Sequence, residues 1–507
     1  MRRRTTRYLR IGLIPASIVL AGIVLSRLRE LFQPAPPATP TFIAANHPHI
    51  RYVGRWDLRD ANHPSVGWQG ATITLQFDGT ALSALMRPQY SRDYIRVVID
   101  GVVQPAMAIE ATDEPVVLAQ NLSAGPHRID IVKETYQGGD MTVAGFWLTG
   151  TLSAPPPAPP HHMVFFGDSN LAGESLSNEE NNNGIEFMGC HYSYAGITAR
   201  MCNASYHNVA YGGSTIGSVQ AIFAQTSMTN TTPWDFASQA ADVVVIDLGS
   251  NDVDKGETRI RADYHAFLDA VRQAYPKAHI VLWNSYGWDS REPANYSAAV
   301  VAERNDPQMS AGKFPWFFAQ WHGCEYDHAG MATYLARHLH AQLGWQIDAA
   351  DVMSGFGQNG DVANGNFAAI APFGGFGWRY ANHPGVARVT DSAGYDGKHF
   401  VRLQAGATIH QPNPAHNGAT VTATLYARSA TAGQLQLTID FRDQTMYTAP
   451  LISHSETFTL NDTWQAYTIA FQAPTTTTTP IFHTRLTIAA AQAAIEVDAV
   501  QMTTGAT

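Results

Sequence analysis

The stretch Met163-Val164-Phe165-Phe166-Gly167-Asp168-Ser169-Asn170-Leu171 decides the fold and the chemistry of this chain. Its four leading apolar residues predict a short buried strand, and Gly167 and Asp168 predict a tight turn directly after it. Ser169 therefore stands at the carboxyl end of a strand. A serine hydroxyl is inert at neutral pH unless a base takes its proton and preset donors stabilise the resulting oxyanion. A catalytic Ser169 therefore requires donors and a base elsewhere in the sequence.

Two later segments supply candidate donors for an oxyanion. Residues 243–248, Val-Val-Val-Ile-Asp-Leu, predict another buried strand, and Asn251 follows it with a side-chain amide. Between the two predicted strands, Gly212 and Gly213 allow a backbone N–H to approach a substrate closely. The residues alone leave either Gly212 or Gly213 as the donor.

The segment Glu325-Tyr326-Asp327-His328 supplies a candidate base with carboxylates one and three residues before it. His322 competes with His328, because it lies only six residues earlier. The chain has 20 histidines, most of which we expect to be solvated or structural.

These four segments, in this order, resemble the SGNH (GDSL) hydrolase superfamily. The resemblance implies that Ser169 is the nucleophile and that its own N–H, the Gly213 N–H and the Asn251 amide form the oxyanion hole. It also implies that His328 is the base. Glu325 stands where the family usually has Asp, and Asp327 directly precedes His328, so either carboxylate, or neither, orients the imidazole.

The residues before the serine segment predict a β-sandwich of jelly-roll type. Residues 42–152 form short alternating runs between turns, such as 72–77 before Asp78-Gly79 and 94–99 before Asp100-Gly101, and no helical period competes. Combined with the serine segment, this region resembles carbohydrate esterase family 2 over residues 50–345. That family couples an N-terminal jelly roll to an SGNH domain, and its members remove acetyl groups from xylan and related glycans.

Strand-like and helix-like segments alternate after the serine. Residues 260–275 show apolar side chains at helical spacing, a strand is predicted at 279–283, and another amphipathic helix at 331–343. This alternation predicts an α/β domain of flavodoxin-like type, a parallel sheet covered by helices on both faces, with the active site at the carboxyl ends of the strands.

From about residue 355 the helix signals stop and strands alternate with turns. This span resembles carbohydrate-binding modules of the galactose-binding-like β-sandwich kind. We expect most tryptophans of the chain to pack in cores, and we predict that three aromatic rings bind substrate, namely Trp283, Trp321 and Trp378. Tyr380 is a further candidate.

The N-terminus carries a targeting signal. Five arginines within residues 2–10 precede a largely apolar run at 11–25, followed by the Pro-rich stretch 34–40. This pattern predicts an exported protein, periplasmic or at the cell surface, with an uncleaved membrane anchor favoured over a cleaved signal peptide. We predict four segments: anchor and linker (1–41), jelly roll (42–153), hydrolase domain (160–348) and C-terminal sandwich (355–507).

Composition limits the partners. Charged residues make up 15% of the chain and the formal net charge is -10, so no basic surface favours nucleic acid. The three cysteines show no metal-site spacing, and we expect neither metal nor cofactor. Cys190 and Cys202 are close enough in sequence for a disulfide, and three buried thiols are the alternative.

Two functions fit these patterns. The first is an exported serine esterase that removes acetyl groups from a polysaccharide. The second is a cell-envelope carbohydrate-binding protein that keeps a hydrolase fold, or an enzyme that transfers acetyl to an exopolysaccharide. Hydrolysis and transfer pass through the same acyl-enzyme, and the oligomeric state does not follow from the sequence.

Overall fold

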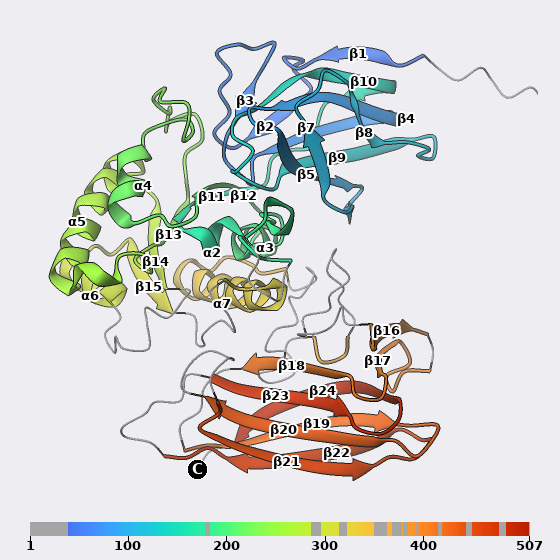
Figure 1. Ribbon diagram of the computed structural model, residues 1–507. Helices are drawn as coiled ribbons and strands as arrows, with labels where there is room; N and C mark the ends of the chain where they lie inside the picture. Colours follow the sequence, from blue (N-terminus) through green and yellow to red (C-terminus); the bar gives the residue numbers. More distant parts are fainter. Residues whose placement is uncertain are drawn as a thin grey trace, which may run out of the picture.

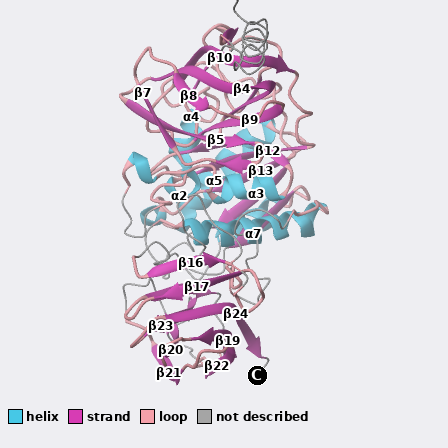
Figure 2. Cartoon of the chain, turned by 90° about the vertical axis from the view of Figure 1, so that its right-hand side faces the viewer, coloured by secondary structure: helices cyan, strands magenta, loops and turns pink. Residues whose placement is uncertain are grey.

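The computed structural model describes residues 39–505 apart from 178–182, 285–295, 314–321, 349–361, 363, 368–377, 379–383, 392, 414–417, 443–448 and 476–482. An N-terminal β domain and a C-terminal β domain lie on opposite sides of a central α/β domain (Figure 1). The view in Figure 2 shows the same three parts stacked in one column. The N-terminal segment 1–38, with the predicted anchor, lies outside the described residues. Within the described part of the chain, no helix is both long and apolar enough to span a membrane.

The N-terminal domain is built from antiparallel strands, as predicted. Its main path runs β1-β10-β4-β9-β5-β6, and the long strands β4 and β10 pair along most of their length. Alternate residues of β4, such as Ile73, Leu75 and Phe77, point into a buried core. The strands are β1 (Thr41–Ala44), β2 (Arg51–Val53), β3 (Ser65–Val66), β4 (Thr72–Pro88), β5 (Arg92–Ile99), β6 (Val102–Val103), β7 (Met107–Glu110), β8 (Val116–Ala119), β9 (Pro126–Lys133) and β10 (Met141–Ser153).

The central domain holds a five-stranded parallel sheet in the order β12-β11-β13-β14-β15. The first strand of this sheet, β11, lies between β12 and β13, so the order in which strands are added reverses between β11 and β13. In such folds, ligands bind in the crevice at the carboxyl ends of these two strands. The strands are β11 (His161–Gly167), β12 (Ala204–Ala210), β13 (Val243–Asp247), β14 (His279–Asn284) and β15 (Met309–Lys313).

Helices cover both faces of this sheet, which confirms the predicted α/β class. In β11, Met163 and Phe165 pack with α3 and α7 on one face, whereas Val164 and Phe166 pack with α4, α5 and α6 on the other. The helices are α2 (Ser169–Ala172), α3 (Tyr194–Met201), α4 (Ile216–Ile222), α5 (Glu257–Ala274), α6 (Tyr296–Arg304) and α7 (Glu325–Leu343), with short 3-10 turns η1 (Ile185–Phe187) and η2 (Val253–Lys255).

Helix α7 begins earlier than the predicted start at residue 331. Cys324 is its N-cap residue, and the carboxylate of Asp327 accepts a hydrogen bond from the Cys324 N–H at 3.0 Å. This reciprocal arrangement is a capping box, which satisfies donors that the first turn of a helix leaves open. As a result, His328 lies inside the helix and not in the loop before it.

The C-terminal domain is a β-sandwich, as predicted. One sheet has the order β16-β17-β24-β19-β22 and the other β18-β23-β20-β21, and a single apolar core lies between them. The strands are β16 (Val386–Thr390), β17 (His399–Leu403), β18 (Thr408–Asn413), β19 (Thr420–Arg428), β20 (Gln434–Arg442), β21 (Ile452–Thr459), β22 (Gln465–Gln472), β23 (His483–Ala490) and β24 (Ile495–Gly505).

Buried side chains tie the N-terminal sandwich to the α/β domain. The fully buried Arg55 donates to the carbonyl oxygens of Phe223 and Gln225, at 2.8 Å each. The Gln69 amide donates to Ala210 O at 2.8 Å, at the end of β12. Trp68 packs into the core of the α/β domain itself. The two parts therefore share a buried interface beside the carboxyl edge of the sheet.

Candidate active site

Ser169 is held at the first position of α2, immediately after β11. Asp168 caps this helix, because its Oδ1 accepts the Asn170 N–H at 2.9 Å. Gly167 has no room for a side chain, since a Cβ there would lie 2.4 Å from the Leu171 side chain. The strand, tight turn and short helix thus place Ser169 at the carboxyl end of the sheet, and it is 9% exposed.

The two glycines of the 212–213 turn differ in their hydrogen bonds. The Gly212 N–H donates to the Tyr136 hydroxyl at 2.9 Å. Gly213 has φ +70, and open space surrounds the position where a Cβ would stand. Because the Gly212 donor is occupied, the geometry favours Gly213 over Gly212 as the group that faces a substrate.

Asn251 follows β13 and lies beside the same turn. One of its amide N–H groups donates to Ser214 O at 3.0 Å, which fixes the side chain against the glycine turn. An asparagine amide carries two N–H donors, so the second is available to a ligand.

One pocket brings these groups together. It encloses about 580 Å³ and includes Ser169, Gly213 and Asn251 in its wall. His322 also lines it, whereas His328 does not. The other lining residues are Tyr136, Gln137, Asp168, Asn170, Glu174, Asn183, Gly212 and Ser250. A serine hydroxyl, a glycine turn, an asparagine amide and an imidazole thus share one cavity at the carboxyl edge of the sheet.

His328 was predicted to be the base, and the structure places it elsewhere. The side chain has no exposed surface, and its Nδ1 accepts a hydrogen bond from the Tyr194 N–H at 3.1 Å. The Tyr194 ring stacks on the imidazole with 5.9 Å between centroids. Burial, followed by the charge of nearby His322, lowers the pKa of His328 to about 3. His328 is therefore a neutral packing residue on the inner face of α7.

His322 shares the wall of the pocket with Ser169. It precedes α7, and its side chain is 12% exposed. Burial lowers the pKa of this imidazole to about 4, so it is neutral at neutral pH. Its Nε2 lies 3.9 Å from Oε2 of Glu174.

Of the two carboxylates predicted to orient the base, Asp327 and Glu325, the structure describes the side chain of Asp327 alone. The Asp327 carboxylate is buried and closes the capping box of α7, so it serves the helix N-terminus. Glu325 is the first residue of α7, but its side chain is outside the described part of the structure. The described residues therefore give the Asp327 carboxylate a structural role.

Two of the predicted substrate-binding tryptophans are core residues, so these predictions are wrong. Trp283 is 1% exposed in the α/β core, and Trp378 is 2% exposed in the C-terminal core beside Phe367. A ring needs a free face to stack on a sugar, and neither ring has one. Trp321 and Tyr380 lie outside the described residues.

An acidic cluster lies under the serine turn. Burial and the charge of neighbouring Asp247 raise the pKa of Asp168 to about 7. The Ser250 hydroxyl donates to Asp168, and the Tyr194 hydroxyl donates to Asp247. The first bond links the turns that follow β11 and β13, and the second links the start of α3 to the end of β13.

Sequence reasoning did not single out Tyr136 and Glu174, and it ranked His322 below His328. Tyr136 belongs to the loop between β9 and β10, so only the folded structure brings it to the pocket. His322 had a sequence signal. The apolar positions of the final helix, 331, 332, 335, 336 and 339, extend back at helical spacing to 328 and place that histidine on the core face.

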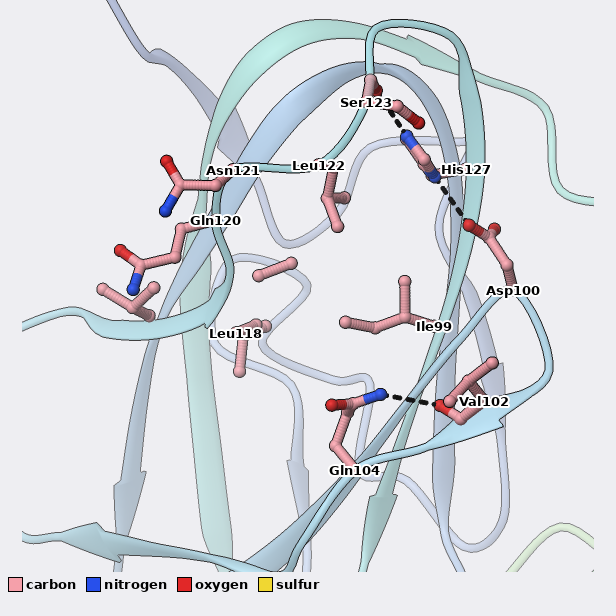
Figure 3. A pocket seen from close by; sticks show the side chains of 12 residues that line it. Ile99, Asp100, Val102, Gln104, Leu118, Gln120, Asn121, Leu122, Ser123 and His127 are labelled. Carbon is pink, nitrogen blue, oxygen red and sulfur yellow. Dashed lines mark hydrogen bonds and ion pairs between the residues drawn. The ribbon is translucent and has the colours of Figure 1, made fainter. Parts of the chain in front are cut away.

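A second pocket lies in the N-terminal sandwich (Figure 3). It encloses about 610 Å³, and His127 stands in its wall between Asp100 and the Ser123 carbonyl, at 2.6 Å and 2.7 Å (Figure 3). Both ring nitrogens are thereby engaged, so this histidine is not placed to activate a nucleophile.

The described part of the chain contains no candidate metal site. No group of three or more His, Cys, Asp or Glu side chains there could hold a metal ion. Cys190, Cys202 and Cys324 are buried thiols outside any disulfide, so of the two alternatives for Cys190 and Cys202 the structure shows the buried thiols.

Two family models match the chain. Residues 52–157 match the N-terminal domain of carbohydrate esterase 2, and residues 165–341 match the GDSL-like lipase/acylhydrolase family. Ser169, Gly213, Asn251 and His322 all fall inside the second match.

Two individual relatives each match more than half of the chain. The cellulase/esterase CelE of Acetivibrio thermocellus is 29% identical over 331 residues, 59% of this chain and 40% of CelE. The acetylxylan esterase / glucomannan deacetylase of Cellvibrio japonicus is 25% identical over 339 residues, 60% of this chain and 91% of that protein. The chain therefore spans less than half of CelE and most of the second protein.

A solved structure agrees with these matches. A family two carbohydrate esterase from Clostridium thermocellum, solved in complex with cellohexaose, is 27% identical with a TM-score of 0.55. The match covers 58% of this chain and 99% of that chain.

Proposed function

Through residues 52–341 the chain belongs to carbohydrate esterase family 2, and on that premise we propose that it hydrolyses O-acetyl esters of a polysaccharide. The shared pocket of Ser169, Gly213, Asn251 and His322 carries the proposal. These groups are the parts that acyl transfer through a serine requires. The name of the acetylxylan esterase / glucomannan deacetylase, and the cellohexaose bound to the solved family two esterase, favour an acetylated polysaccharide such as xylan as the substrate class.

The proposed reaction has two steps. His322 takes the proton of Ser169 as its Oγ attacks the acetyl carbonyl, and then returns a proton to the departing sugar hydroxyl. Water attacks the resulting acetyl-serine by the reverse route and releases acetate. The N–H groups of Ser169 and Gly213 and the Asn251 amide stabilise the oxyanion in both steps.

The test is acetate release by the full chain from p-nitrophenyl acetate and from acetylated xylan, with Ser169→Ala as the matched variant. We expect Ser169→Ala to lose about 10⁴-fold or more in turnover. Retention of a tenth of the activity contradicts the nucleophile assignment. A parallel reaction with a sugar acceptor separates hydrolysis from transfer, since transfer yields an acetylated sugar in place of free acetate.

The proposal extends to location and to the C-terminal sandwich. Five arginines before the apolar run at 11–25 support export with an N-terminal membrane tether. The resemblance of the C-terminal sandwich to carbohydrate-binding modules supports a role in holding the polysaccharide. Fractionation of cells that express the full chain tests the first point, and retention on insoluble xylan with and without residues 355–507 tests the second. Full release into the medium contradicts the tether, and equal retention contradicts the binding role.

A further inference from the structure

Glu174 is a buried carboxyl group in the pocket that the proposed reaction does not use. It follows α2, with Gly173 in a left-handed conformation that turns the chain toward the pocket. Its side chain is 7% exposed. A charge removed from water to this extent is costly unless nearby groups favour it, so its place in the pocket wall calls for a partner.

Two groups from different domains face this carboxyl. The Tyr136 hydroxyl, from the N-terminal sandwich, donates to Glu174 Oε1 at 2.6 Å. The other oxygen, Oε2, lies 3.9 Å from Nε2 of His322. Tyr136 is itself fixed because its hydroxyl accepts the Gly212 N–H at 2.9 Å. The carboxyl is thus oriented by one domain and directed at the imidazole of the other.

The sequence has no carboxylate three residues before His322. The usual acid of this superfamily lies three residues before its histidine, and for His322 that position is Ala319. The family-type carboxylate is therefore missing at its customary spacing from the histidine that lines the pocket.

We propose that Glu174 is the positioning carboxylate of His322 and that Tyr136 of the N-terminal sandwich holds it in place. The inference rests on the proposed function for its catalytic consequence, but the interaction itself does not. When His322 takes the serine proton it becomes an imidazolium, and a carboxylate about 4 Å away stabilises that charge.

Other ionisable groups surround this pair. Asp168, at the start of α2, has its pKa raised in part by the charge of Glu174, and Asp247 lies behind it on β13. His328 of α7 has its pKa lowered by burial and then by His322. Burial raises the pKa of Glu174, while the Tyr136 hydrogen bond opposes that rise. On acidification Asp168 therefore takes up a proton near pH 7, and His322, with a pKa of about 4, takes up its proton at lower pH.

Two substitutions should shift this proton uptake in opposite directions. Glu174→Gln removes the charge but keeps an acceptor for Tyr136, so His322 should titrate at lower pH. Tyr136→Phe removes the donor that favours the carboxylate, so the pair should take up its proton at higher pH. Glu186→Gln is the matched control, since it makes the same change on an exposed carboxylate.

The experiment follows the imidazole by NMR of full-length protein with labelled histidine, and His322→Gln assigns the signal. The same variants are assayed for kcat/KM against pH. We expect Glu174→Gln to lower kcat about 5- to 1000-fold, the range for unit charges about 4 Å apart between effective dielectrics of ~80 and ~20. The acidic limb of the kcat/KM profile should move to lower pH in Glu174→Gln and to higher pH in Tyr136→Phe.

The two readouts separate the two proposals. A shifted His322 titration in a protein without esterase activity overturns the proposed function and leaves the Glu174 interaction established. An unchanged His322 titration in Glu174→Gln, equal to that of Glu186→Gln, overturns the inference even if the protein is an active esterase. Glu174→Asp keeps the charge, so it should restore part of the titration shift that Glu174→Gln loses.

Discussion

The loop before α7 and the first turns of α7 hold two histidines six residues apart, and they have opposite surroundings. His322 lines the pocket, whereas His328 is fully buried and bonded to the Tyr194 backbone. The capping box at Cys324 and Asp327 separates them, because every residue after it must follow the helical repeat. The start of one helix therefore decides which imidazole can reach a substrate.

Replacing His322 should produce the largest effect on this comparison. His322→Ala removes the only imidazole that the described residues place in the wall of the Ser169 pocket, and kcat should fall about 10⁴-fold while the protein stays folded. Steady-state hydrolysis of p-nitrophenyl acetate measures the loss. A fall below tenfold, together with a large fall in His328→Gln, would return the base to His328.

Replacing Asn251 tests whether the pocket that His322 lines is the active site. Asn251→Ala should lower kcat about 10²- to 10³-fold, because the amide is needed chiefly when charge develops on the carbonyl oxygen. KM should change far less. Kinetics on acetylated xylan and on p-nitrophenyl acetate check this, and a change confined to KM would make Asn251 a substrate-binding residue.

His328 should control stability against acid. Its pKa is about 3 in the folded protein, against about 6.5 in an unfolded chain. Above pH 6.5 both states leave it neutral. Below that value only the unfolded state takes up the proton, so stability falls until the folded pKa is reached.

His328→Gln should remove about 1.4 kcal/mol per pH unit of this loss between pH 6 and 4. Denaturant unfolding of the wild type and the variant over that range measures the slope. Identical slopes in the two proteins contradict a buried neutral His328.

Asp327 should give the smallest effect. Asp327→Asn keeps an acceptor for the Cys324 N–H and loses a charge at a helix N-terminus, which is worth about 0.3–1 kcal/mol. Thermal unfolding should show that small shift, with kcat within about tenfold of wild type. A loss near 10⁴-fold, as expected for a carboxylate that orients a catalytic imidazole, would restore Asp327 as the acid.

Local patterns were enough to predict the elements that carry the nucleophile and the donors. Ser169 and Asn251 each follow a short apolar run, and in a parallel sheet such runs end at the same edge. The glycine turn was also visible, but the choice between its two N–H groups required Tyr136. The tryptophans were the least predictable, because the sequence does not show which face of a ring is covered.

The sequence by itself determined the order of the three domains, the strand-to-turn position of Ser169 and the class of the fold, because strand periodicity and turn residues are local properties. The tertiary structure alone decided which histidine lines the pocket and which carboxyl faces it. His322 meets Glu174, 148 residues away in sequence, and Glu174 meets Tyr136 of another domain. Such contacts depend on how packed elements are oriented, and no residue's neighbours in sequence carry that information.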